Sequence, residues 1–181
     1  MQFIFISANA AILDKRSLSV PVQLCKDDID AVSFQISVVT ASYKGFVVSS
    51  GYAELLALRK QAQILETQLK KTYTNCCTYT GAVSKEEVDA VISAVNPAIP
   101  QATTALSLAK IKKNQLAQVS LSTNIVKSSL ANLNVPAVNL YTCLRGAVPS
   151  EYFSYLLIIN NYIFRLDIAF ADAIGAYTAT I

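Results

Sequence analysis

The chain has 181 residues, which is long enough for one domain with a sizeable core. Hydrophobic residues make up 53% and charged residues only 15%, and the net charge of +3 comes from scattered residues, so the composition excludes a disordered tail and shows no nucleic-acid-binding surface. There is no histidine, which excludes a Ser-His-Asp triad, a Cys-His pair and a zinc site with a histidine ligand.

The first 16 residues have the features of a processed leader. A short apolar run, Phe3 to Ile6, precedes Ala8-Asn9-Ala10, which is typical of a signal cleavage site, and Lys15-Arg16 is a candidate dibasic processing site. We therefore expect a secreted protein with a leader at residues 1–16 and a single helical domain at residues 17–181. The alternative is an ordinary unstructured leader.

Two helices are predicted in the first half of the domain. We expect the first to begin at Asp27 or Asp28, because acidic residues favour the positive end of a helix. Its apolar residues recur at steps of three and four: Ile29, Val32, Ile36, Val39, Tyr43 and Phe46. The second helix covers residues 52–73 with the apolar stripe Leu55, Leu58, Ala62, Leu65 and Leu69. The polar stretch TYTNCCTYTG is predicted to be the loop that ends it.

The third helix has the clearest start in the sequence. Ser84 and Glu87 form a capping box, in which each side chain bonds the backbone of the other residue. The apolar stripe that follows stays in phase through Pro97 and Pro100, although proline weakens a helix interior. Two helices or a loop would also fit two prolines, but the unbroken phase favours one helix. We predict a bend near residues 96–100 and continuation to about Val119.

Two further helices complete the predicted fold. The fourth covers residues 122–145, where Pro136 should bend or interrupt it, and the fifth starts at Pro149-Ser150 and extends to about Tyr177. The sequence thus predicts an all-α bundle of about five helices, with the third and fourth bent by proline. No transmembrane helix is predicted, because polar and charged residues interrupt the most apolar stretch: Asn160, Asn161, Arg165, Asp167 and Asp172.

Four cysteines, Cys25, Cys76, Cys77 and Cys143, are candidates for disulfide bonds in an oxidising compartment. A bond between the neighbours Cys76 and Cys77 would close a small, strained ring. We therefore expect each of them to pair with one of the other two, in either arrangement. Four buried thiols are the alternative, and a metal site is disfavoured because no CxxC spacing occurs.

The surplus of apolar residues has two uses: a thicker core, or a cavity between the helices that holds a lipid. In the second case, hydroxyl and amide groups on the apolar stripes would bond a ligand carboxylate, although each could equally bond a neighbouring backbone carbonyl. Asn160 is placed in phase with Phe153, Leu156 or Leu157, Ile163 and Phe170. The candidate lipid-binding residues are Ser33, Ile36, Thr40, Leu58, Leu65, Ile92, Val95, Ile99, Leu106, Ser129, Leu133, Leu157, Asn160 and Phe164.

The middle of the chain is similar to a known family. The stretch SKEEVDAVISAVNPAIPQATTALSLAKIKKNQL joins a capped acidic helix start, a proline bend, Ala105-Leu106 and Lys112-Lys113. This order resembles the fungal hydrophobic surface binding protein A and cell wall galactomannoprotein family. VPSEYF resembles the start of the last helix of that family, and RLDIAFADAIGAY resembles its close. The resemblance covers residues 26–178.

The resemblance implies a secreted or wall-associated helical bundle without catalysis. Some members hold long-chain fatty acids in a tunnel, and others adsorb to hydrophobic surfaces and recruit a polyester-degrading hydrolase. We therefore expect a non-enzymatic protein without a cofactor or a metal, whose partner is a fatty acid or another apolar small molecule. The alternative is an adhesion or recruitment protein on hydrophobic surfaces. A homodimer stays open, and no nucleic-acid partner is expected.

Overall fold

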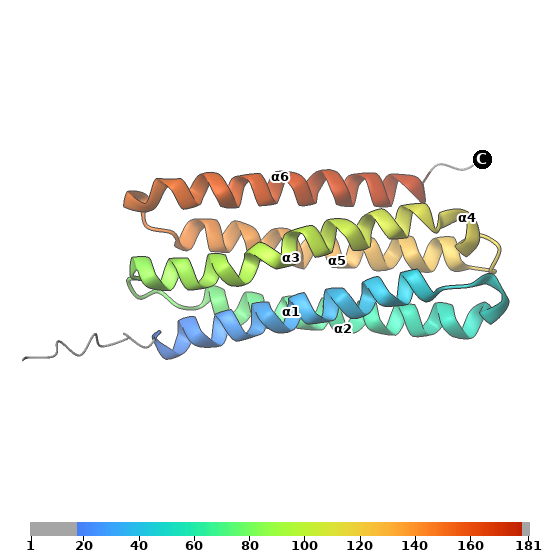
Figure 1. Ribbon diagram of the computed structural model, residues 1–181, viewed down its shortest axis with the longest axis horizontal. Coiled ribbons are helices and arrows are strands. Elements are labelled where there is room, and N and C mark those ends of the chain that lie inside the picture. Colours follow the sequence, from blue (N-terminus) through green and yellow to red (C-terminus); the bar gives the residue numbers. More distant parts are fainter. Residues whose placement is uncertain (1–17, 179–181) are drawn as a thin grey trace, which may run out of the picture.

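The computed structural model describes residues 18–178, so the predicted leader with Lys15-Arg16 lies outside the described residues. Every long element in this range is an α-helix (Figure 1). The helices are α1 Val20–Gly45, α2 Gly51–Cys77, α3 Lys85–Ile111, α4 Lys113–Leu116, α5 Ser122–Ala147 and α6 Phe153–Ala176. Two 3₁₀ turns, η1 Val48–Ser50 and η2 Ser150–Tyr152, precede α2 and α6. The predicted all-α bundle is confirmed.

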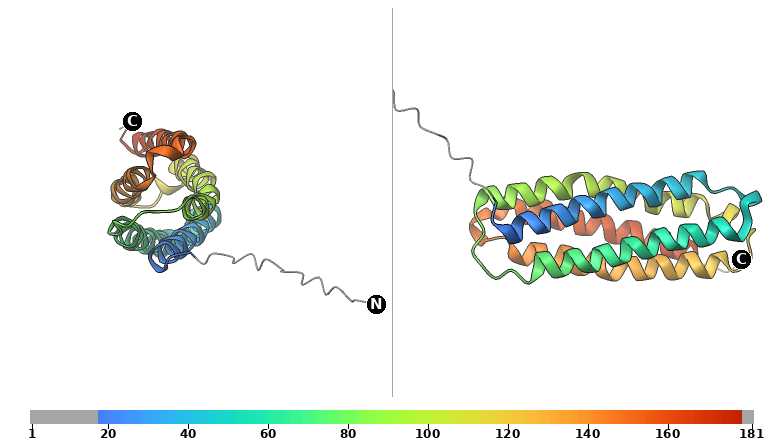
Figure 2. Two further views of the ribbon diagram at one scale, coloured as in Figure 1. Left: turned by 90° about the vertical axis from the view of Figure 1, so that its left-hand side faces the viewer. Right: turned by 90° about the horizontal axis from the view of Figure 1, so that it is seen from below.

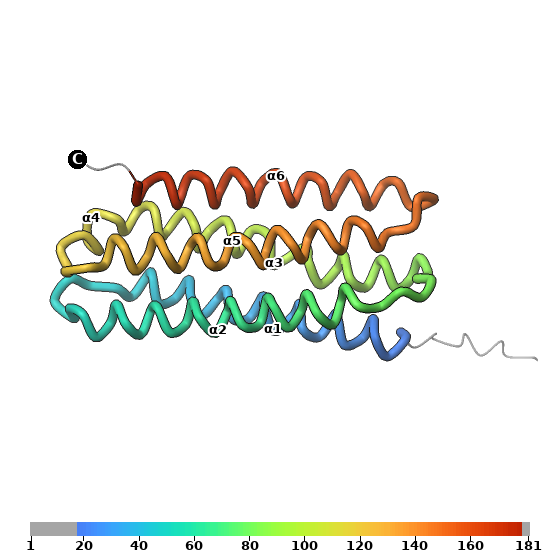
Figure 3. Tube along the Cα trace, turned by 180° about the vertical axis from the view of Figure 1, so that it is seen from behind, coloured from blue at the N-terminus to red at the C-terminus, as the bar shows by residue number. Residues whose placement is uncertain are grey.

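The five long helices lie side by side and run up and down the long axis of the molecule (Figures 1 and 3). Helix α1 packs on α2 and α3, α2 also packs on α5, and α6 packs on α3 and α5. Seen end-on, α1 and α2 lie side by side, α3 packs on α1, α5 packs on α2, and α6 packs on both α3 and α5 (Figure 2). Within residues 18–178 no single helix is long and apolar enough to cross a membrane. One pair of segments, Val20–Gly45 and Val48–Cys77, meets the length and composition criterion when taken together, but the two are bent by 97° relative to each other.

One predicted boundary in each of the first two helices was wrong. Helix α1 begins at Val20, well before Asp27, because Pro21 lies in the first turn, where a helix needs no hydrogen bond from that residue. Helix α2 continues past residue 73 to Cys77, although this stretch is polar. The hydroxyls of Thr72, Thr74 and Thr78 each donate to the carbonyl four residues earlier, so these side chains are satisfied within the helix.

The capping box that starts α3 is confirmed. The Ser84 hydroxyl accepts from the Glu87 N–H at 3.3 Å, and the Glu87 carboxylate accepts from the Ser84 N–H at 2.9 Å. Helix α3 passes through Pro97 and Pro100 without a break, and Figure 1 shows it changing direction near its middle. It ends at Ile111, where the short α4 takes over, so the predicted extension to Val119 was wrong. Helix α5 likewise runs unbroken through Pro136.

The core consists largely of the stripes that the periodicity predicts in the first three helices. The predicted phase of the last helix was wrong. Its buried residues are Ile159, Tyr162, Leu166, Phe170 and Ala173, and Leu157, Asn160 and Phe164 are exposed.

Helix α6 is apolar on both faces, so periodicity alone does not select its inner face. Hydrogen bonds to α3 select the inner face. Tyr155 donates to Asp89, and Tyr162 donates to Asn96. Tyr177 donates to the Ala109 carbonyl at 2.6 Å.

Candidate functional site

A cavity of about 300 Å³ lies at the end of the bundle where α1 and α3 begin and α2 and α5 end; we refer to it as the end cavity. Its volume is at the lower limit for ligand pockets. Its polar lining residues are Asn75, Tyr79, Thr80, Glu87 and Tyr141. Most of its wall is apolar, with side chains that include Val22, Val83, Val88, Val91, Ile92, Val95, Leu144, Val148 and Ile159.

A second cavity of about 60 Å³, the central cavity, lies between the helices in the middle of the bundle. Its lining is almost wholly apolar: Val32, Ile36, Val39, Ala62, Leu65, Leu69, Ala102, Ala105, Leu106, Leu130, Leu133, Ala137, Leu166 and Phe170, with Tyr43, Ser129 and Tyr141 as the polar members. Tyr141 also lines the end cavity, so this side chain borders both cavities.

The two cavities lie one after the other along the bundle, with Tyr141 between them. Along α1 their walls extend from Val22 to Tyr43, a length of about 30 Å at the rise of an α-helix. The central cavity is too narrow for a bulky ring system but borders flexible aliphatic side chains that can change rotamer. The shape therefore suits one extended aliphatic chain.

The hydroxyls of Tyr43 and Tyr141 are donors inside these cavities. The two residues are 5% and 7% exposed, and neither hydroxyl has a hydrogen-bond partner among residues 18–178. Burial raises the pKa of both phenols, which keeps them protonated. A ligand oxygen that accepts a hydrogen bond from either phenol would be stabilised.

The Glu87 carboxylate lines the end cavity. It accepts from the Ser19 N–H at 3.0 Å as well as from the Ser84 N–H, and hydrogen bonds from these two residues lower the pKa of Glu87 to about 2. The side chain is therefore negatively charged throughout the physiological pH range. Neither cavity has another charged side chain in its wall within the described part of the chain.

Two disulfide bonds hold the wall of the end cavity. The Cys25–Cys76 bond connects α1 to α2, and both of its residues line the cavity. The Cys77–Cys143 bond connects α2 to α5. This is one of the two arrangements that the sequence left open. The end of α2 is thus linked covalently to both of its neighbours.

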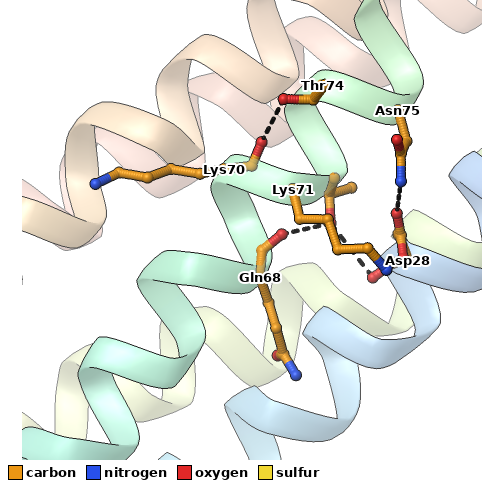
Figure 4. A network of polar contacts seen from close by, with 7 residues as sticks. Asp28, Gln68, Lys70, Lys71, Thr74 and Asn75 are labelled. Carbon is orange, nitrogen blue, oxygen red and sulfur yellow. Dashed lines mark hydrogen bonds and ion pairs between the residues drawn. The ribbon is translucent and has the colours of Figure 1, made fainter.

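A buried carboxylate reinforces the same wall. Figure 4 shows the Asp28 side chain of α1 directed at α2, where it accepts from Lys71 Nζ at 2.7 Å and from the Asn75 side-chain amide. Asp28 is 7% exposed, so both donors are needed to offset the loss of hydration of its charge. Because Asn75 lines the end cavity, this network also fixes one of its polar groups.

The structure brings together only part of the predicted site. Five candidates line the central cavity, Ile36, Leu65, Leu106, Ser129 and Leu133, and two line the end cavity, Ile92 and Val95. Leu58 and Ile99 are buried in the core but line neither cavity.

The polar candidates mostly bond the protein itself. The Ser33 hydroxyl donates to Gln101 at 2.8 Å, and the Ser129 hydroxyl donates to the Ile125 carbonyl at 2.9 Å. Thr40 donates to the Ile36 carbonyl and lines a shallow surface groove. On α6, Leu157, Asn160 and Phe164 lie on the exposed face, away from both cavities, because the predicted phase of that helix was wrong.

Tyr43, Asn75, Glu87 and Tyr141 line the cavities but were not among the predicted residues. A signal existed for the two tyrosines, because each carries a hydroxyl on an otherwise apolar stripe. Tyr43 follows Val39, and Tyr141 follows Leu133 and Ala137 at steps of four. No local signal distinguishes the capping role of Glu87 from a place in a cavity wall.

The arrangement offers apolar space with a few polar groups in its wall, which suits the binding of an apolar ligand. Within residues 18–178, no group of three or more metal-ligating side chains could hold a metal ion. What the cavities provide is apolar surface, the phenol groups of Tyr43, Tyr79 and Tyr141, and the Glu87 carboxylate.

Solved structures show the same fold. Afmp4p in complex with palmitic acid is 20% identical with a TM-score of 0.79, and the match covers 86% of this chain and 99% of that chain. Ligand binding domain 1 of the Penicillium marneffei MP1 protein, complexed with arachidonic acids, is 16% identical with a TM-score of 0.77, over 88% and 99% of the two chains. Ligand binding domain 2 of the same protein, complexed with multiple arachidonic acids, is 18% identical with a TM-score of 0.73, over 92% and 100%.

The sequence itself places the chain in a family. No curated protein matches it. The family model of hydrophobic surface binding protein A matches residues 22–146, which is well over half of the chain and includes the disulfides and most of both cavity walls. The chain therefore belongs to the hydrophobic surface binding protein A family.

Proposed function

We propose that this chain is a secreted, non-catalytic protein that binds a long-chain fatty acid or a similar aliphatic lipid between its helices. The observation that carries the proposal is the pair of cavities with mostly apolar walls, which lie in line along the bundle and share Tyr141. Proteins of the same fold that were crystallised with palmitic and arachidonic acids support this ligand class. The two disulfides fit an extracellular location, where such bonds persist.

The driving force would be burial of the aliphatic chain. Each methylene that leaves water contributes about 0.8 kcal/mol, so about ten methylenes contribute some 8 kcal/mol before the entropy cost of binding. The bound aliphatic chain of the lipid would also contact atoms of the cavity walls that border empty space in the free protein. The end cavity provides the entrance, because Thr80, Gly81 and Gly146 on its wall are exposed.

Native mass spectrometry of the delipidated full chain tests the proposal. We expect a saturable one-to-one complex with palmitic acid. The variant Ala137→Phe fills the central cavity and should weaken binding at least about tenfold, whereas Ala131→Phe on the exposed side of the same helix should not. Circular dichroism confirms that both variants fold. Absence of any lipid complex would refute the proposal, and so would equal binding by the two variants.

A second candidate function is adsorption to hydrophobic surfaces, and one observation favours it. The outer face of α6 exposes large apolar side chains at helical spacing: Phe153 63%, Leu157 57%, Phe164 64% and Ile168 48%. Apolar patches of this kind are typical of contact surfaces. If they anchor the protein, Leu157→Ser with Phe164→Ser should reduce adsorption to a polyester film several-fold. Leu56→Ser on α2, which is 41% exposed, is the matched control. Unchanged adsorption would rule out this surface.

A further inference from the structure

The electrostatics of the end cavity bear on the kind of lipid that fits. Glu87 is the one charged side chain in the wall of either cavity, and no Lys or Arg lines them within residues 18–178. Its carboxylate accepts two backbone N–H groups and forms no ion pair in that range. A ligand carboxylate in this cavity would therefore meet a negative charge that no cation in the wall offsets.

The helix ends at the cavity do not compensate for this charge. The positive ends of α1 and α3 face it, but the Ser19 N–H before α1 and the Ser84 N–H before α3 are both donated to Glu87. Helices α2 and α5 terminate at the same cavity, at Cys77 and Ala147, and the carbonyl end of a helix carries partial negative charge. Two backbone N–H groups at the helix starts are thus already used by Glu87.

Uncharged donors are available instead. Tyr141 lines both cavities, 93% of this residue is buried, and its phenol carries an O–H donor. The Asn75 amide donates one N–H to Asp28, and Tyr141 is the polar residue that lines both cavities. A phenol donor bonds an ester or alcohol oxygen without requiring a charge.

We propose that these cavities select a long-chain lipid whose polar end is an uncharged hydrogen-bond acceptor, such as an alcohol or an ester, over the carboxylate of the same chain length. This inference rests on the proposed function, because it refines the ligand of the same site. The aliphatic chain enters the central cavity, the polar end remains in the end cavity beside Tyr141, and Glu87 disfavours an anion there.

The test compares palmitate, 1-hexadecanol and methyl palmitate as competitors of a bound fluorescent lipid at pH 8, with the delipidated full chain. Glu87→Gln removes the charge and keeps the capping box, because glutamine is accepted at that position. Glu86→Gln, on the exposed neighbouring residue that lines neither cavity, is the matched control. For each probe, the affinity for a variant is compared with the affinity for the original chain, so the different water solubilities of the three probes cancel.

We expect Glu87→Gln to raise the affinity for palmitate about tenfold and to leave the affinities for the two uncharged probes within about twofold. Glu86→Gln should change none of them. An unchanged palmitate affinity in Glu87→Gln would overturn the inference while the proposed function stands. Failure of all three probes to bind would overturn both.

A second variant tests the donor. Tyr141→Phe keeps the ring and removes the hydroxyl, so methyl palmitate should bind about fivefold more weakly. Tyr73→Phe, on the exposed side of α2, should have no effect. If the ester binds equally well to Tyr141→Phe, the assignment of this residue to the polar end is overturned.

Discussion

The two ends of the bundle are built differently. At the end where α1 begins, a cavity of about 300 Å³ separates the helices, and both disulfides lie there. At the opposite end, Phe46, Leu55 and Leu116 have no exposed surface. Helix termini there are joined by hydrogen bonds, such as Lys112 Nζ to the Phe46 carbonyl at 3.1 Å and the Ser122 hydroxyl to the Leu116 carbonyl.

This difference shows how a small bundle can be hollow at one end and still hold together. A cavity removes contacts between helices, and the loss of packing has to be offset. Here the Cys25–Cys76 and Cys77–Cys143 bonds connect three helices around the hollow end, and the packed end has neither cysteine nor disulfide among the described residues. We infer that covalent links replace packing where a ligand needs space.

The largest expected effect follows from breaking a disulfide at the hollow end. In Cys77→Ala with Cys143→Ala, a link across 66 residues is lost, and the chain-entropy relation gives a decrease of about 4 kcal/mol in the free energy of unfolding. Urea denaturation of the delipidated protein measures it. A loss below about 1 kcal/mol would show that packing, and not the covalent link, stabilises this end.

A matched pair of truncations compares the packing of the two ends directly. Leu116→Ala at the packed end should cost about 4 kcal/mol, whereas Leu144→Ala in the wall of the end cavity should cost about 2–3 kcal/mol. The second leucine already borders empty space, so fewer contacts are lost. Denaturant titration of both delipidated variants gives the two values. Equal losses would contradict a hollow end in the free protein.

A smaller effect concerns pH. The folded-state pKa of Glu87 is about 2, below its ordinary value of 4.5, so its hydrogen bonds to Ser19 and Ser84 stabilise the fold above pH 4.5. That contribution is lost as the pH falls from about 4.5 to 2. We expect it to be under about 1 kcal/mol, because solvent screens the partly exposed carboxylate. Between pH 5 and pH 3, Glu87→Gln should lose less stability than the original chain or Glu86→Gln; identical slopes would exclude this role.

Much of the fold could be predicted from the sequence because burial and helical period agree in most of the chain. The apolar stripes of α1, α2 and α3 and the Ser84–Glu87 capping box are examples of local signals that packing leaves unchanged. Helix α6 is the exception. Both of its faces are apolar, and its orientation depends on tyrosine hydroxyls that reach α3 from more than 60 residues away.

The candidate site was less predictable, because a cavity depends on several helices at once. Periodicity identifies Ile36, Leu65 and Leu133 as inward-facing, but the same evidence selects Leu58 and Ile99, which are packed solidly. The polar residues of the site were even harder to predict from the sequence. Glu87 serves a helix cap and a cavity wall together, and only the position of its neighbours reveals the second role.

The central claim is that the aliphatic chain lies inside the bundle and not on the outer face of α6. Photo-crosslinking with a hexadecyl lipid that carries a diazirine at the end of its chain tests this most directly. We predict, by peptide mass spectrometry, crosslinks to the walls of the central cavity, in residues 32–43 of α1 and 130–141 of α5, and their loss in Ala137→Phe. Crosslinks confined to the exposed face of α6 around Phe164 would contradict the account.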